Sequence, residues 1–215
     1  MRVALVYDRV NKWGGAERVL LALHDIWPEA PLYTAVYDAK RAPWAQVFDV
    51  RPSFLQHFPF AKSHHELYPW LTQMAFESFS FDEFDVVISV TSAEAKAIIT
   101  KPGTLHVCYC LTPTRYLWSG YETYQETSRG LAKQVHGWMT PLLRKWDLVA
   151  SSRPDYYIAV SDRVKDRIEK YYSRRVEKVI YPPVETSKGV ALQQSLQGHP
   201  LKNGDYFLVV SRLVG

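Results

Sequence analysis

The fold is decided near the start of the chain, where residues 2–17 read RVALVYDRVNKWGGAE. Residues 2–7 form a short apolar run that predicts a buried strand. A loop with Gly14 and Gly15 follows, and residues 15–26 carry apolar side chains at helical spacing. A strand, a glycine turn and a helix in this order predict the first βα unit of a parallel sheet.

The same alternation continues along the chain. Further strands are predicted at 31–37, 46–51, 85–90, 105–110, 156–160 and 178–181, and further helices at 65–79, 128–151 and 162–172. Most strand segments are nearly continuous apolar runs, as expected for strands that helices cover on both faces. Ser161 is the predicted N-cap of the last helix. We therefore expect an α/β fold, namely a three-layer Rossmann-like domain with a parallel sheet.

The composition predicts a domain boundary after residue 184. Pro182-Pro183 forbids further regular hydrogen bonding, and the Ser-, Gln-, Gly- and Lys-rich stretch beyond it has no periodicity, which indicates a linker. A strand pattern resumes at 206–210, and one strand cannot bury itself. We expect a domain at 1–184, an interdomain linker at 185–204, and the first strand of a truncated second domain at 205–215.

Charge and cysteine usage narrow the class of protein. A formal net charge of +4 permits anionic partners, such as nucleotide-sugar phosphates or an acidic lipid surface, and does not favour nucleic acid. The two cysteines, Cys108 and Cys110, lie on one face of a predicted strand and are too poorly placed to bridge, so we expect buried free thiols and a reducing compartment. The chain shows neither a signal-peptide pattern nor an apolar run of membrane-spanning length. We expect a cytoplasmic protein, with peripheral contact at the inner face of the cell membrane left open.

The Gly14-Gly15 turn suits phosphate binding. Glycines let a ligand approach backbone N–H groups at the positive end of a helix. The pattern is not the dinucleotide fingerprint, so a nicotinamide dehydrogenase is disfavoured. Glu17 would repel a phosphate if it pointed the same way, and we expect it to face sideways. The alternative is that the glycines serve only a tight turn.

Six motifs together resemble one family. In chain order they are VALVY at 3–7, GGAE at 14–17, DVVIS at 85–89, YIAVS at 157–161, VIYPPV at 179–184 and VSRL at 210–213. Their order and spacing resemble the family 4 retaining glycosyltransferases of GT-B fold, and most closely the bacterial mannosyl- and rhamnosyl-transferring enzymes of surface polysaccharide synthesis. The resemblance implies that this chain is the amino-terminal, acceptor-side half of a GT-B fold. It also implies that a second Rossmann domain grips the nucleotide sugar.

On the donor side, the resemblance assigns three residues. Gly14 and Gly15 would approach the donor diphosphate and the transferred sugar, which agrees with the turn's own chemistry. Arg212 would supply a bidentate cation to the same diphosphate. The two glutamates that mark the family's donor site would belong to the second domain, so we expect this chain alone to be inactive.

On the acceptor side, the candidates follow the strand at 105–110. Arg115 is a candidate ligand of an acceptor phosphate, or else a surface ion-pair partner. Tyr116 and Trp118 are candidates for stacking on a sugar, or else for packing in the core or an interface. Many relatives have a histidine where this chain has Leu111, so no catalytic residue is assigned.

The implied function is transfer of a hexose or deoxyhexose from a nucleotide sugar to a glycan or lipid-linked acceptor. No metal or other cofactor is expected, because cationic side chains and helix ends would stabilise the leaving nucleoside diphosphate. One alternative is a nucleotide-sugar epimerase of GT-B fold. Another is a non-catalytic domain that binds a glycan or a partner, which Leu111 favours.

The predicted helix at 65–79 is more aromatic than one buried face requires. It is a candidate for contact with a membrane, to which Arg144, Lys145, Trp146 and Arg153 would add. The alternative is that it packs against the sheet or the second domain.

Overall fold

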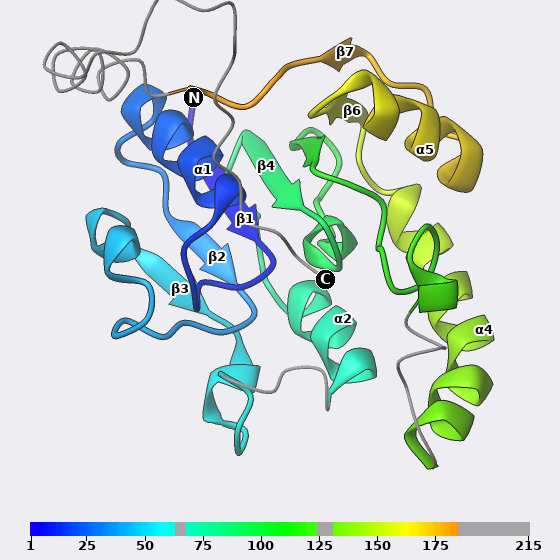
Figure 1. Ribbon diagram of the computed structural model, residues 1–215. Coiled ribbons are helices and arrows are strands. Elements are labelled where there is room, and N and C mark those ends of the chain that lie inside the picture. The colour runs from blue at the N-terminus through cyan, green and yellow to red at the C-terminus, as the bar shows by residue number, and fades with distance from the viewer. Residues whose placement is uncertain (63–67, 124–130, 185–215) are drawn as a thin grey trace, which may run out of the picture. The chain divides into compact units, whose positions relative to one another are not determined.

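The computed structural model describes residues 1–62, 68–123 and 131–184 (Figure 1). The strands are β1 (Val3–Tyr7), β2 (Leu32–Thr34), β3 (Val50–Pro52), β4 (Val86–Thr91), β5 (Leu105–Cys110), β6 (Tyr156–Ala159) and β7 (Lys178–Val179). The α-helices are α1 (Gly15–Ile26), α2 (Pro69–Glu77), α4 (Leu131–Ser151) and α5 (Asp162–Tyr172). Short 3₁₀ helices are η1 (Pro43–Val47), η2 (Phe54–His57) and η4 (Ala95–Ala97).

All seven strands belong to one parallel sheet in the order β3-β2-β1-β4-β5-β6-β7. The chain proceeds from β1 outward to β3, crosses back to β4 beside β1, and then proceeds outward to β7. Val3 is paired with Val86 across the central pair of strands. The predicted α/β fold with a parallel sheet is confirmed.

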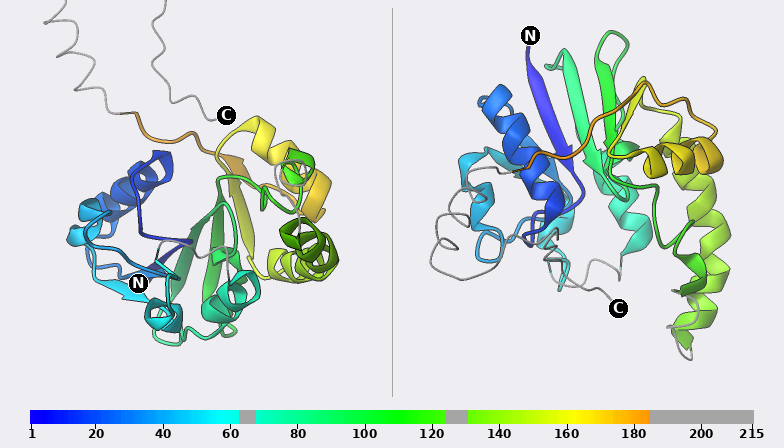
Figure 2. Two further views of the ribbon diagram at one scale, coloured as in Figure 1. Left: turned by 60° about the horizontal axis from the view of Figure 1, so that its bottom comes forward. Right: turned by 45° about the horizontal axis from the view of Figure 1, so that its top comes forward.

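Side chains of β1 alternate between the two faces of the sheet. Leu5 packs with Leu20 of α1 on one face, whereas Val6 packs with Phe76 of α2 on the other. Figure 2 shows α1 on one side of the sheet and α2 and α4 on the opposite side. The three layers of the Rossmann-like domain therefore consist of α1, the sheet, and α2 with α4.

The predicted strand at 46–51 is wrong in its first part. Pro43 begins η1, which continues through Val47, and the strand is restricted to Val50–Pro52. Proline fixes φ near its helical value and suits the first turn of a helix. Pro52 has no N–H group to donate to a neighbouring strand, and it is tolerated in β3 because β3 is an edge strand.

The strands predicted at 31–37 and 178–181 are shorter in the structure, at Leu32–Thr34 and Lys178–Val179, whereas other predicted elements agree closely. The helices at 15–26 and 162–172 and the strand at 105–110 have the predicted bounds. Ser161 caps α5 as predicted, because its Oγ accepts a hydrogen bond of 3.3 Å from the N–H of Val164. The helix predicted at 65–79 is observed at Pro69–Glu77, and residues 63–67 lie outside the described ranges.

The chain divides into two units, Met1–Pro182 and Pro183–Gly215. The linker predicted at 185–204, the strand at 206–210 and the candidate Arg212 all lie outside the described residues. Within the described ranges, no helix combines the length and the apolar character that crossing a membrane requires.

Two kinds of buried polar group lie in the middle of the sheet. Cys108 and Cys110 are free and buried, which confirms the prediction of two buried thiols. His106 on β5 is fully buried, and its Nε2 lies 2.8 Å from the Oγ of Ser89 on β4. Burial, followed by the nearby positive charge of Arg153, lowers the pKa of His106 from 6.5 to about 3.

His106 makes stability depend on pH. In the unfolded chain it takes up a proton near pH 6.5, whereas in the folded protein it does so only near pH 3. Stability is therefore lost as the pH falls through this range, by up to about 1.4 kcal/mol per pH unit from this group. We expect the stability of His106→Gln, measured by urea unfolding between pH 7 and pH 4, to fall less steeply than that of the wild type. Parallel curves for the two proteins would contradict the assignment.

Candidate functional site

The candidate site lies at the carboxyl edge of the sheet, where the loops that follow the strands meet. In open parallel sheets this edge is where ligands bind. The loop after β1 leads to Gly14 and Gly15 at the start of α1, so the glycine turn lies at the predicted edge. The loops after β4 and β5 come to the same edge beside it.

Neither glycine of the turn is needed for backbone conformation. Gly14 is extended, with φ −165°, and of the glycines described only Gly103 has a positive φ. A Cβ added at Gly15 would meet no heavy atom of the chain within 4 Å, whereas one at Gly14 would lie 3.1 Å from Oε2 of Glu17. The space in front of Gly15 is therefore open, which is not what a purely structural tight turn requires.

The glycine turn also exposes the amino end of α1. Because the N-cap is Gly14, α1 has no N-cap side chain. The first N–H groups of a helix have no partner within the helix itself. This end consequently offers backbone donors and a partial positive charge to an anion.

Glu17 turns back toward the sheet. It is only 1% exposed, and its Oε1 accepts a hydrogen bond of 2.9 Å from the hydroxyl of Tyr7 at the end of β1. Its Oε2 is buried and makes no hydrogen bond to a described residue. Burial, with the Glu17 carboxylate adding to it, raises the pKa of Tyr7 above its ordinary range. The Glu17 carboxylate thus lies between Tyr7 and Gly14, and it does not approach Gly15.

Asp8 connects the loop after β1 to the loop after β4. It is buried, and its Oδ1 accepts hydrogen bonds from the Thr91 hydroxyl at 2.7 Å and the Ala95 N–H at 2.9 Å. Its Oδ2 accepts from the Ser92 N–H at 2.7 Å and, more weakly, from the Ser92 hydroxyl at 3.3 Å. One carboxylate therefore fixes the course of residues 91–95.

Glu94 connects the same loop to the loop after β5. Its Oε1 accepts a hydrogen bond of 2.5 Å from the Tyr116 hydroxyl, and its Oε2 lies 4.0 Å from Nη2 of Arg9. Burial raises the pKa of Glu94, while the positive charge of Arg9 acts in the opposite direction. Arg9 and Tyr116 are thus held on either side of a buried acid.

Lys96 and Asp147 form a buried ion pair behind these loops. Nζ of Lys96 lies 2.6 Å from Oδ1 of Asp147 on α4, and both side chains are almost fully buried. Asp147 also accepts hydrogen bonds from the Thr114 hydroxyl at 2.7 Å and from Nε1 of Trp118 at 2.6 Å. Burial alone would lower the pKa of Lys96, but the Asp147 carboxylate outweighs burial and the pKa is raised.

The predicted acceptor-side residues occupy different environments. Arg115 is exposed, and it forms no ion pair with the residues that the structure describes. Tyr116 is bonded to Glu94, and Trp118 is bonded to Asp147 and stacked on Tyr171 with ring centroids 5.4 Å apart. Packing inside the domain therefore accounts for the two aromatic residues, whereas the side chain of Arg115 is exposed.

Sequence reasoning missed the four charged residues that organise this edge. Asp8 directly follows β1, and Glu94 and Lys96 lie within five residues of the end of β4, a position that could have drawn attention to them. Asp147 lies within α4, and only the identity of its partners reveals its role. Among the described residues, no group of His, Cys, Asp and Glu side chains could hold a metal ion.

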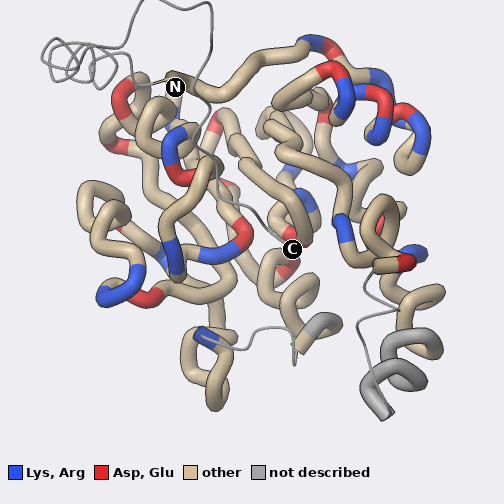
Figure 3. The backbone as a smooth tube through the Cα atoms, in the orientation of Figure 1, with Lys and Arg blue, Asp and Glu red and all other residues tan. Residues whose placement is uncertain are grey.

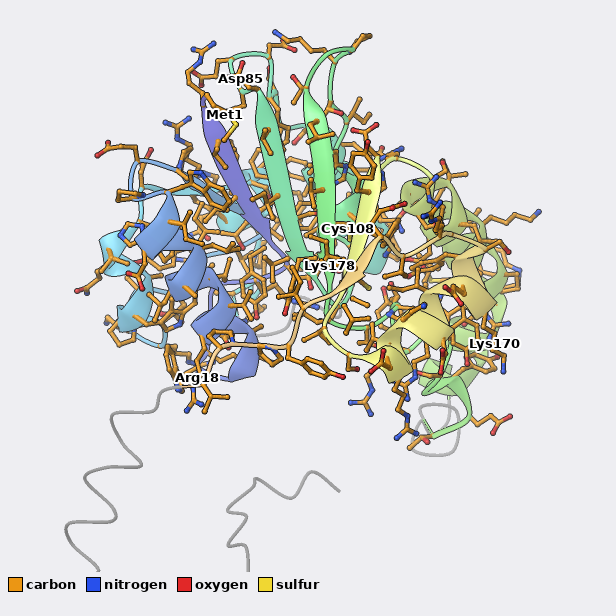
Figure 4. The ribbon with its side chains drawn as sticks, turned by 90° about the horizontal axis from the view of Figure 1, so that it is seen from above. Met1, Arg18, Asp85, Cys108, Lys170 and Lys178 are labelled. Atoms are coloured by element: carbon orange, nitrogen blue, oxygen red, sulfur yellow. The ribbon has the colours of Figure 1, made fainter. Side chains whose placement is uncertain are left out.

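A pocket of about 480 Å³ opens at the opposite, amino edge of the sheet. Its charged residues pair with one another, as Glu83 does with Arg2 and Arg51 at 3.9 and 3.7 Å, in exposed positions. Figure 4 shows Met1 and Asp85 together at this edge, and Arg18 of α1 at the other end of the domain. We place the candidate site at the carboxyl edge, because within the described part of the chain helix amino ends and buried charged groups converge there.

The Lys96–Asp147 pair can be tested with a double-mutant cycle. We expect Lys96→Met and Asp147→Asn each to lower the free energy of unfolding by about 3–5 kcal/mol, because each leaves a buried charge without its counterion. The double variant should be less destabilised than the sum of the two, by about 1–3 kcal/mol. Chemical denaturation measures all three, with the exposed Lys145→Met as a control expected within about 0.5 kcal/mol of wild type. Additive losses would show that the two charges do not interact.

No protein-family model matches the chain, and no curated protein matches it at a significant level.

Proposed function

We propose that this chain is the amino-terminal domain of a retaining glycosyltransferase, and that its Gly14-Gly15 turn receives the diphosphate and transferred sugar of a nucleotide-sugar donor. The observation that carries the proposal is the open space in front of Gly15 at the uncapped amino end of α1. Gly14 leaves room for the carboxylate of Glu17, whereas nothing in the described part of the chain approaches Gly15, so close approach of a ligand is the proposed reason for Gly15.

The electrostatics of the turn support an anionic ligand. A helix amino end favours an anion by about 0.3–1 kcal/mol at an exposed site. Oε1 of Glu17 is directed at Tyr7 and its Oε2 lies against Gly14, so a phosphate would approach the turn at Gly15. A diphosphate that meets backbone donors on this side would need a second set of cations from elsewhere, which the resemblance assigns to Arg212 and to a second domain.

Arg115 is the proposed contact to an acceptor. It is exposed at the carboxyl edge, next to Tyr116 and Trp118, which the buried network holds in place. A phosphate or carboxylate of a glycan or lipid-linked acceptor would suit a guanidinium. The proposed reaction is transfer of a hexose or deoxyhexose in polysaccharide synthesis, at the inner face of the cell membrane.

A non-catalytic glycan-binding domain is the second candidate. Leu111 favours it, because this position after β5 carries a histidine in many of the enzymes that the chain resembles. The two candidates differ in one observable, since a binding domain would retain a glycan without consuming a donor.

The proposal is tested by donor turnover in the full-length protein. We expect Gly15→Val to abolish release of nucleoside diphosphate from a panel of nucleotide sugars, because the new side chain would fill the space reserved for the ligand. The variant should remain folded, since a Cβ at Gly15 meets no other atom. Asp25→Val, which places the same side chain in the exposed last turn of α1, is the control and should keep wild-type turnover. Unchanged turnover in Gly15→Val would refute the donor assignment, and an inactive wild type that binds glycan would favour the second candidate.

The present chain should bind nucleotide sugars only weakly. The turn contributes backbone donors, while the proposed cations of the donor site lie in the second domain. We expect titration calorimetry with the 215-residue chain to give dissociation constants in the millimolar range, which corresponds to a binding free energy of about −4 kcal/mol. Micromolar affinity would show that the donor site lies in this half.

A further inference from the structure

Trp13 is a large apolar side chain that remains on the surface directly before the glycine turn. It is 49% exposed, and Gly14 and Gly15 follow it in the chain. One exposed apolar residue is ordinary on a protein surface. The significance of Trp13 therefore depends on how firmly its loop is held.

The loop that carries Trp13 is anchored on both sides of the turn that it makes after β1. The N–H of Val10 donates a hydrogen bond of 3.0 Å to the carbonyl of Val36, in the loop after β2. Nearer the glycine turn, the carbonyl of Lys12 accepts a hydrogen bond of 2.8 Å from Nε1 of Trp44. Trp13 is thus exposed on a segment whose backbone is fixed.

Trp44, in η1, also supports the ring of Trp13. The two ring centroids lie 6.2 Å apart and the ring planes meet at 62°, which is an edge contact and not a parallel stack. Trp44 in turn makes an edge contact with the buried Phe48, with ring centroids 6.1 Å apart. The ring of Trp13 is therefore held by an aromatic cluster, and about half of the residue stays open to solvent.

Trp13 differs in this respect from the two residues that were predicted to stack on a sugar. Tyr116 and Trp118 each donate a hydrogen bond to a buried carboxylate, and Trp118 is already stacked on Tyr171. Within the described ranges, Nε1 of Trp13 donates no hydrogen bond and no ring is stacked on it. Trp13 consequently offers a ring and a donor that the predicted pair uses inside the domain.

The surface around Trp13 is basic. The acids of this segment, Asp8 and Glu17, are buried, whereas Lys12 and Arg18 are exposed. Figure 3 shows blue and red close together in this part of the chain, and burial of the acids leaves the basic residues at the surface. The Cα–Cβ bond of Arg18 is inclined toward the turn, as such bonds are inclined toward the amino end of any helix. A ligand beside Trp13 is therefore favoured if it is anionic.

We infer that Trp13 is a stacking platform for the pyranose ring of a phosphorylated sugar, next to the glycine turn. A pyranose ring has an apolar C–H face that can pack on an indole, and hydroxyl groups that can accept a hydrogen bond from its N–H. A phosphate on that ring would be close to Gly15, two residues along the chain, and to Lys12. A lipid tail would make no use of these cations, and a second copy of the chain would bring the same positive charge.

The platform lies on the opposite side of the glycine turn from Arg115. Trp44 belongs to η1, which connects β2 to β3, whereas Arg115 follows β5. β2 and β5 lie on different sides of β1 in the sheet. A ring on Trp13 is therefore separate from the contact proposed for Arg115, and it belongs either to the donor or to a sugar unit of the acceptor. The inference rests on the proposed function, and it adds the residue that recognises the ring.

The indole N–H signal of Trp13 in NMR spectra of the 215-residue chain tests the inference, and Trp13→Phe identifies that signal. We expect it to shift with at least one of the 1-phosphates of mannose, glucose, galactose and rhamnose, with a dissociation constant in the millimolar range. Inorganic phosphate and mannitol should leave it in place, because neither has a ring. The signals of Trp70 and Trp138, which are exposed on α2 and α4, should not shift.

Turnover by the full-length protein separates the two sources of the ring. We expect Trp13→Ala to raise the KM of the donor or of the acceptor at least roughly tenfold, and the affected substrate is the one whose ring stacks. Trp13→Tyr should restore most of the loss, since it keeps an aromatic face. Trp70→Ala removes an exposed tryptophan from α2 and is the matched control, with both KM values expected to stay unchanged. Thermal unfolding should show all variants folded.

Three results would overturn the inference. The first is a Trp13 signal that none of the sugar phosphates shifts, or that shifts no more than those of Trp70 and Trp138. The second is an equal shift with guanosine or uridine diphosphate, because a nucleobase would then occupy the ring. The third is a Trp13→Ala enzyme with both KM values unchanged. Failure of the proposed function gives a different result, namely a wild type without turnover, and a Trp13 signal that shifts with sugar phosphates would then still support the platform.

Discussion

The arrangement of the carboxyl edge depends on the hydrogen bonds that the buried carboxylate of Asp8 accepts. Asp8 directly follows β1 and accepts hydrogen bonds from four donors in residues 91–95, at the end of β4 and in the loop after it. That loop in turn carries Glu94 and Lys96, which hold the loop after β5 through Tyr116 and Thr114. Three loops that are far apart in the sequence therefore take their positions from one residue.

The buried charges fix the positions of the loops at this edge, whereas the space next to Gly15 of the glycine turn is empty. An ion pair such as Lys96–Asp147 adds little net stability, but any arrangement that separates its members leaves an uncompensated charge. Alternative loop positions are therefore costly. The edge is preformed, and next to it a Cβ added at Gly15 would meet no heavy atom within 4 Å. Preformed donors next to an empty space are the arrangement that a binding site requires.

Local pattern was sufficient for most of the fold, because strands buried on both faces and amphipathic helices are encoded in neighbouring residues. The bounds of α1, β5 and α5 were predicted on that basis. The strand at 46–51 was predicted incorrectly in its first part. The apolar run there fits a strand as well as a helical turn, and Pro43 favours the helical turn. The charged network could not be predicted for another reason. Lys96 and Asp147 are 51 positions apart in the sequence, and no local sequence pattern indicates that they form a pair.

The central position of β1 has a consequence for the order of folding. β1 pairs with β4, and Val3 meets Val86, so the middle of the sheet joins segments 83 positions apart. Contacts between such distant segments are slow to form, because a long loop must close before they contribute any stability. During synthesis, Asp8 remains without its donors until residue 95 has left the ribosome. The first βα unit must therefore wait, with its apolar strand exposed, for the second half of the sheet, and this interval is when the chain is most prone to aggregation.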